Sequence, residues 1–231
     1  MRTLSNLDFL RLWELGVDLH PVDRALLTLS AALPHESHDE LADWPLGQRN
    51  TALAKVRVAC FGRRMQGWVP CPQCGERLEF AFDAEALKAD PGHAEVGFHG
   101  RSFRPPTSRD LAKIAGEENE RDAAWQLAQQ CCVEDCEAQT WSEQDLDALG
   151  DCLVQADPMA ETRVHLDCAQ CGAQWEETLD IAAWLWTEVE ARARRLLHEV
   201  HTLASAYGWT EAEVLALSEP RRAAYLEMVK A

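Results

Sequence analysis

Two short cysteine motifs constrain this chain more than any other feature of its sequence. Cys71-Pro-Gln-Cys74 and Cys168-Ala-Gln-Cys171 are each followed by a glycine. A tight turn with two residues between the cysteines directs both sulfurs at one point, and the glycine can supply a positive φ at the exit. Two such turns provide the four thiolates of a tetrahedral zinc shell. The sequence therefore predicts one structural Zn²⁺ ion bound by Cys71, Cys74, Cys168 and Cys171.

The two motifs are far apart in the chain, so the predicted zinc ribbon is split around residues 75–167. Both copies continue into similar strand-like sequence, in which Glu79 matches Glu176 and Asp83 matches Asp180. Four sulfur ligands leave no position for water, so we expect the site to stabilise the fold rather than to catalyse a reaction. Two independent redox or buried cysteine pairs are the main alternative, and a disulfide between the pairs is the lesser one.

The remaining cysteines and the histidines give weaker signals. Cys132 and Cys136 stand four apart beside Cys131, which allows a second metal site, although small apolar residues near a helix end are the favoured interpretation. His198 and His201 stand three apart, whereas the zincin pattern needs four, so a ligand role is the less favoured interpretation. Among the other cysteines and histidines, Cys60 and Cys152 are expected in the core, and His165 is expected on a strand.

Net charge restricts the partners of this chain. Its 231 residues carry a formal net charge of -17, which disfavours both nucleic acid and anionic membrane surfaces. No apolar run approaches the ~20 residues of a membrane span, and no secretory signal is recognisable, so we expect a cytoplasmic protein. Phosphate-binding glycine loops and nucleophile elbows are missing from the sequence, which predicts no enzyme and no small-molecule substrate. Basic or neutral proteins are the expected partners.

Hydrophobic periodicity predicts an α+β fold that is mainly α-helical, with a small split zinc-ribbon-like β element. Five regions are expected to form one compact unit. They are an N-terminal helical region (1–66), the first zinc knuckle and strands (67–104), a helical insertion (105–158), the second zinc knuckle (159–180), and a long C-terminal helix with a helical tail (181–231).

Several elements can be predicted individually. The expected elements are helices starting near residues 5 and 21, a polar connection over 34–45, a helix over 48–65, one strand over 96–103, helices near 108, over 120–132 and over 142–155, strands over 162–166 and 174–179, and a long helix over 180–207. Gly208 should end that helix, and Thr210 with Glu213 should cap the next. Arg221 and Arg222 begin the last helix, against the helix dipole, which indicates a partner or an internal carboxylate such as Glu213 or Glu227.

A series of short markers follows in order along nearly the whole chain. They are Trp13-Glu14, His20-Pro-Val-Asp-Arg-Ala25, Leu46-Gly-Gln-Arg49, the Cys71 motif, Phe103-Arg-Pro-Pro-Thr-Ser-Arg-Asp-Leu111, Asp157-Pro-Met-Ala-Glu161, Glu199-Val-His201, Tyr207-Gly-Trp-Thr-Glu211 and Arg221-Arg-Ala-Ala-Tyr225-Leu226. Together these markers resemble the T-even-type phage baseplate protein family. Bacterial relatives of that family occur with phage-tail-like contractile injection systems.

The resemblance implies a part, or an assembly factor, of the baseplate hub of a contractile tail, with other baseplate and tail proteins as partners. It supplies no catalytic residues. It implies a cytoplasmic protein during assembly, which then either leaves or is incorporated in a tail-like particle. Ala169 replaces the proline of the first motif but removes no ligand. A zinc-ribbon regulator that binds nucleic acid and a metal-dependent hydrolase are the alternative functions.

Overall fold

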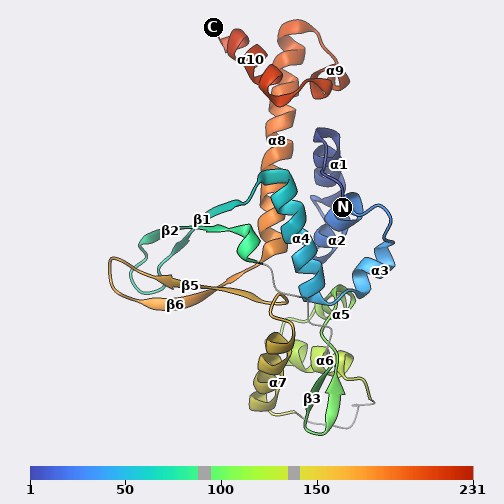
Figure 1. The fold of residues 1–231 in the computed structure, drawn as a ribbon, viewed down its shortest axis with the longest axis vertical. Helices are drawn as coiled ribbons and strands as arrows, with labels where there is room; N and C mark the ends of the chain where they lie inside the picture. The colour runs from blue at the N-terminus through green and yellow to red at the C-terminus, as the bar shows by residue number, and fades with distance from the viewer. Residues whose placement is uncertain (88–94, 135–140, 231) are drawn as a thin grey trace.

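The computed structural model describes residues 1–87, 95–134 and 141–230, and the long helix α8 is the axis of the molecule (Figure 1). Three two-stranded antiparallel sheets accompany the helices, so the predicted α+β class with mainly helical content is confirmed. The elements are α1 (Asn6–Gly16), α2 (Pro21–Ala32), α3 (His38–Asp43), α4 (Leu46–Phe61), β1 (Arg64–Pro70), β2 (Arg77–Asp83), η1 (Ala84–Ala86), β3 (Val96–Phe98), β4 (Arg101–Phe103), α5 (Ser108–Ile114), α6 (Glu120–Cys131), α7 (Glu143–Ala156), β5 (Thr162–Asp167), β6 (Gln174–Leu179), α8 (Ile181–Tyr207), α9 (Glu211–Ala216) and α10 (Glu219–Lys230).

Helix α8 forms as its sequence predicts. Asp180 caps its start by accepting a hydrogen bond from the Ala183 N–H, and Gly208 ends it at a φ of 70°. Its apolar stripe is buried along most of its length, because helices α1, α2 and α4 pack against it. The stripe residues that are at most 1% exposed are Leu185, Val189, Ala193, Leu196 and Leu203.

A second, smaller core lies at the other end of the molecule, below the N-terminal helices in Figure 1. Helices α6 and α7 and the β3–β4 hairpin enclose it. Phe103 is fully buried there, and its ring meets that of Trp141 edge-on with 5.8 Å between centroids. Cys131 and Leu149 complete this core, so the helices between the two cysteine motifs have an apolar centre of their own.

Buried polar contacts join the two parts. Asp157 is fully buried and accepts a hydrogen bond of 2.8 Å from the Gly47 N–H in the first turn of α4. Nearby, the Asn50 side chain donates to the Met159 carbonyl at 2.9 Å. A hydrogen bond to a charged group inside a protein contributes about 1.5–3 kcal/mol, so these contacts fix how the chain returns after α7.

The Gly47 contact gives a prediction with an internal control. A Cβ at Gly47 would overlap the Asp157 carboxyl group, whereas a Cβ at Gly150 in α7 meets nothing within 4 Å. We expect Gly47→Ala to lower the free energy of unfolding by roughly 2 kcal/mol, since overpacking and a lost buried hydrogen bond combine. Gly150→Ala should raise it by about 0.5–1 kcal/mol through helix propensity. Urea unfolding of both variants checks this; equal effects would contradict it.

Two predicted elements are wrong. Residues 34–45 are not only a connection, because Ser37 and Glu40 form a capping box that starts the short helix α3. Residues 96–103 are not one strand but the hairpin β3–β4, which turns at His99 and Gly100 with φ values of 48° and 77°. Both residues adopt the left-handed conformation that a tight hairpin turn requires.

The helix predicted over 48–65 is shifted. Helix α4 begins at Leu46 after Pro45 and ends at Phe61, where Gly62 has a φ of 85°. Strand β1 then starts at Arg64, so the last residues of the predicted N-terminal helical region belong to the first hairpin instead. The remaining predicted helices and strands agree with the structure to within a few residues.

The last helices fold back on α8. Thr210 and Glu213 form the predicted capping box of α9. The internal carboxylate expected for Arg222 exists, but it is Glu199 of α8 rather than Glu213 or Glu227. Arg222 is fully buried, and its Nε donates to Glu199 at 2.8 Å. Within the described residues, no helix combines the length and apolarity that crossing a bilayer requires.

Candidate metal centre

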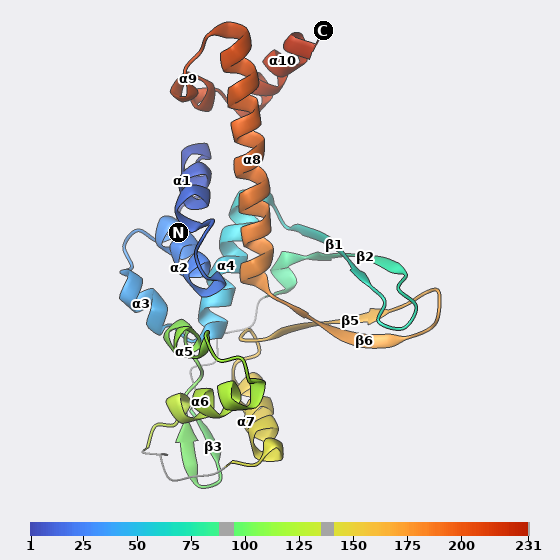
Figure 2. The ribbon, with the colours of Figure 1, turned by 180° about the vertical axis from the view of Figure 1, so that it is seen from behind.

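Two antiparallel hairpins extend sideways from the helical body and meet at their tips (Figure 1, and from behind in Figure 2). One is β1–β2, paired from Arg64 opposite Asp83 to Pro70 opposite Arg77. The other is β5–β6, which leads directly into α8. In β2 every second residue is half-buried and those between are exposed, the pattern expected of a strand with one covered face. We call the two hairpins together the arm.

Each hairpin turns at one of the cysteine motifs, and the two turns share one geometry. In the first, the Cys71 N–H donates to the Glu76 carbonyl at 2.8 Å, and the Gly75 N–H donates to the Cys71 carbonyl at 2.9 Å. Gly75 has a φ of 74°, which is the positive value predicted for the exit of the turn. The second turn has the same bonds, Cys168 to Ala173 and Gly172 to Cys168, both at 2.8 Å, with a φ of 75° at Gly172.

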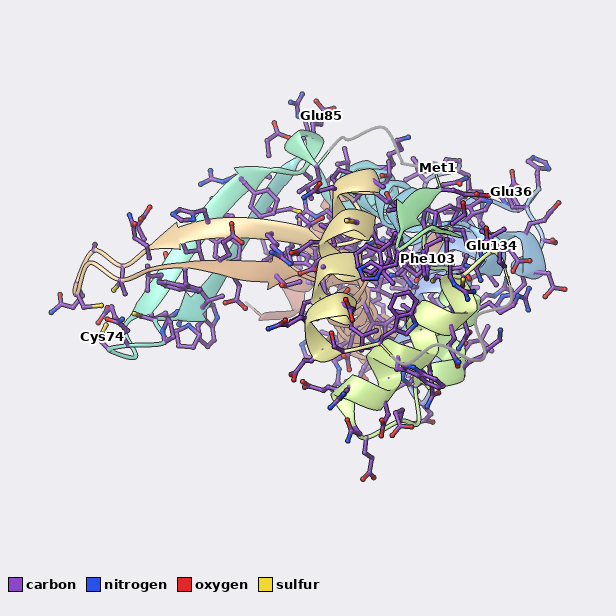
Figure 3. All side chains as sticks on the ribbon, turned by 90° about the horizontal axis from the view of Figure 1, so that it is seen from below. Met1, Glu36, Cys74, Glu85, Phe103 and Glu134 are labelled. Carbon is purple, nitrogen blue, oxygen red and sulfur yellow. The ribbon has the colours of Figure 1, made fainter. Side chains whose placement is uncertain are left out.

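The four predicted cysteines converge at the tip of the arm. Their sulfurs all lie within 4.8 Å of one another, and Figure 3 shows Cys74 at this end of the molecule. The shortest contacts join the two hairpins: Cys71 Sγ lies 3.6 Å from Cys171 Sγ, and Cys74 Sγ lies 3.7 Å from Cys168 Sγ. All four are free thiols. The set can hold a metal ion, and this geometry argues against two independent cysteine pairs.

The electrostatics of the cluster favour a cation at its centre. Desolvation acts against the Cys71 thiolate, but N–H groups of Cys74 and Gln73 favour it, and the pKa of Cys71 falls to about 7. The Glu76 N–H favours the Cys74 thiolate, yet desolvation and the neighbouring sulfur of Cys171 raise the pKa of Cys74 to about 12. Four thiolates this close repel one another, so a bound cation is needed to deprotonate them all.

The other candidate ligands do not form a second centre in the described residues. The four-cysteine set is the one group of three or more Cys, His, Asp and Glu side chains close enough there to hold a metal. Cys131 is buried in the smaller core, where burial raises its pKa to about 12. Cys132 is disulfide-bonded, and Cys136 lies outside the described residues. His198 and His201 are exposed on α8.

The structure also places the three single positions for which the sequence makes a prediction. His165 lies on β5, as expected, and is exposed. Cys60 packs against the main core but is only half-buried. Cys152 is also half-buried and belongs to neither core, so of the two cysteines expected in the core only Cys60 packs against one.

None of the sequence-based predictions includes an exposed aromatic site on the arm. The Trp68 side chain is 54% exposed, and the Arg77 guanidinium lies 4.6 Å from the centre of its ring. Strand alternation could have located this pair, because Trp68 and Arg77 both fall on the exposed face of β1–β2. Trp and Arg are the residues most enriched at protein-binding hot spots.

The four cysteines, two from each hairpin, together offer four sulfur ligands to one metal ion. No protein-family model, curated protein or solved structure matches this chain.

Proposed function

We propose that the cysteine cluster binds one structural Zn²⁺ ion. Four sulfurs at about 2.3 Å from zinc in a tetrahedron lie about 3.8 Å from one another. The closest sulfur pairs, at 3.6 and 3.7 Å, are near that value. A donor set of four thiolates also favours zinc over the hard cations Mg²⁺ and Ca²⁺, which prefer oxygen. Zinc in this shell ties the tips of hairpins whose sequences are nearly one hundred residues apart.

On this basis, we propose that the protein is a non-enzymatic component or assembly factor of the baseplate hub of a phage-like contractile tail or injection system. The observation that carries the proposal is the arm, whose two hairpins meet at four converging cysteines beside an elongated helical body (Figure 2). A protruding arm and the outer side of α8 present separate surfaces to neighbours in an assembly. Zinc bound by all four cysteines would act as a clamp and keep the arm in one shape while those neighbours dock.

The markers that resemble the baseplate family support the proposal through their positions. Two pairs of markers meet inside the fold at buried polar contacts, and a third polar contact lies within a single marker. The joined residues are Gly47 with Asp157, Glu199 with Arg222, and, within one marker, Arg104 with Asp110. Such residues determine how helices meet, so the likeness concerns the frame of the protein rather than a catalytic centre.

Capture from the cells that encode this protein tests its role. Tagged full-length protein should retain tube, sheath or other baseplate proteins, identified by mass spectrometry after cross-linking. We expect a Cys74→Ser variant to retain less of them, because its arm is no longer clamped. Recovery of no tail-type protein by either form would overturn the proposal.

The two alternative functions have distinct signatures. A nucleic-acid regulator needs a basic face, which a net charge of -17 opposes, and its DNA affinity would fall steeply as salt is added. A metal-dependent hydrolase needs an open metal position, which a shell of four sulfurs lacks. DNA titrations at two salt concentrations and metal analysis separate both alternatives from the proposed role.

A further inference from the structure

A slot of about 260 Å³ lies between the two hairpins, where they leave the helical body. Val69 and Phe80 of one hairpin line it from one side, and Val164 and Leu166 of the other line it from the opposite side. The first turns of α8 close it at the base through Ala183 and neighbouring residues. The slot therefore exists only while both hairpins hold their positions.

Two aromatic rings form part of the wall of the slot. The Trp184 ring lies 5.9 Å from the Phe80 ring, centroid to centroid, and both residues line the slot. Gly67 allows this arrangement, because a Cβ there would overlap the end of the Trp184 ring. The missing side chain at Gly67 lets the Trp184 ring pack directly against the strand backbone.

The rim of the slot carries negative charge. Trp68 borders the slot, but its side chain belongs to the outer, exposed face of β1–β2, where the Arg77 guanidinium lies 4.6 Å from the centre of its ring. Glu177 and Asp180 are exposed carboxylates on the opposite side, and no Lys, Arg or His is among the described residues that line it. The net charge of -17 adds a long-range negative potential.

We propose that this slot receives an apolar side chain, aromatic or leucine-like, from a basic segment of a partner protein. The apolar walls select the side chain, and the acidic rim selects Lys or Arg residues that flank it. This inference rests on the proposed function, in that it names the kind of segment through which an assembly partner docks.

Synthetic peptides test the chemistry of the occupant. Four fluorescent peptides differ only in their centre and flanks: phenylalanine with basic flanks, phenylalanine with acidic flanks, phenylalanine with neutral flanks, and glycine with basic flanks. Anisotropy titrations with the full-length, metal-loaded protein at physiological salt should rank the first peptide tightest. Replacing its phenylalanine with glycine, or its basic flanks with acidic ones, should weaken binding by about tenfold or more.

A matched pair of variants locates the binding. Ala183 and Ala206 are both exposed alanines on α8, but only Ala183 lines the slot. Ala183→Trp should fill the slot and weaken binding of the first peptide about tenfold, whereas Ala206→Trp should leave it unchanged. Circular dichroism and metal content of both variants should match the parent, since neither residue is in a core or binds the metal.

Two results would overturn the inference: equal binding of the two basic peptides, which indicates charge attraction alone, or equal binding to both alanine variants. Absence of binding by every peptide would overturn it as well. Failure of the proposed function would show in a different experiment, the capture from cells, as recovery of no tail-type protein. A protein that binds the peptides through the slot but captures no tail protein would keep this docking site and lose the baseplate role.

Discussion

Replacing Cys74 with serine is expected to release the arm while the helical body stays folded. Cys74 is exposed, and exposed substitutions usually change stability by no more than about 0.5 kcal/mol. As a ligand of the proposed zinc ion, however, it contributes to a site of a kind whose metal binding drives folding by roughly 10 kcal/mol or more in small domains. Loss of one ligand should therefore cost the arm at least about 3 kcal/mol, far beyond the cost of an exposed side chain.

Gln73→Ser is the matched control. Gln73 is exposed in the same turn and carries no sulfur, so its replacement by serine should leave the metal and the arm unchanged. Elemental analysis should find one zinc per chain in the parent and in Gln73→Ser, and substoichiometric zinc in Cys74→Ser. Hydrogen exchange should show protection lost from β1–β2 and β5–β6 and retained in α1, α2 and α8.

A strong chelator added to the parent protein should reproduce the Cys74→Ser exchange pattern. Both treatments remove the same cation, after which the sulfurs at the tip repel or become protonated. Unchanged zinc content in Cys74→Ser, or arm protection equal to that of Gln73→Ser, would contradict the clamp. The α8 core gives an internal reference in each experiment, because its buried stripe does not touch the cluster.

The cysteine site could be predicted from sequence because its information is local. Each motif determines its own turn, and Gly75 and Gly172 mark both exits. Helix α8 could be predicted for a similar reason, since its stripe, its Asp180 cap and Gly208 all lie within or beside it. In both cases neighbouring residues alone specify the structure.

A very short helix and a feature that depends on distant contacts were missed. Helix α3 has only six residues, too few to show a clear apolar periodicity, although Ser37 and Glu40 form a local capping box. The slot on the arm needs two hairpins that the sequence separates and only the fold brings together. Hydrophobic periodicity contains no information on contacts between distant segments, so it could not predict the slot, whereas the capping box of α3 could have been recognised.

The prediction that Glu213 or Glu227 pairs with Arg222 is wrong because the actual partner is distant in sequence. Glu213 and Glu227 are near Arg222 in sequence, whereas Glu199 is two helices away. Helix α10 folds back against α8, and this reversal brings Arg222 to Glu199. Glu199 lies three residues after Leu196 and four before Leu203, which is helical spacing for the buried stripe. A carboxylate at such a position needs a buried cation, and that is the signal the sequence did contain.

Arg222→Ala is expected to detach the C-terminal helices from α8. The arginine is fully buried, donates to Glu199 at 2.8 Å and also donates to the Leu217 carbonyl. Removing one partner of a buried ion pair costs roughly 3–5 kcal/mol, because the other charge stays in a poorly solvated place. Arg195, 3.4 Å from Glu199, offsets part of that cost. We therefore expect a loss near 3 kcal/mol, concentrated in α9 and α10.

Arg221→Ala and a double variant complete this experiment. Arg221 is the exposed neighbour, so its replacement should change stability by about 0.5 kcal/mol or less. Glu199→Leu with Arg222→Met replaces the pair by apolar side chains of similar volume and should recover most of the loss. Denaturant unfolding and hydrogen exchange of α9 and α10 provide the readouts. If Arg222→Ala behaves like Arg221→Ala, the buried pair does not hold these helices on α8. If the double variant is no better than Arg222→Ala, the arginine acts through its contact with Leu217 rather than through charge.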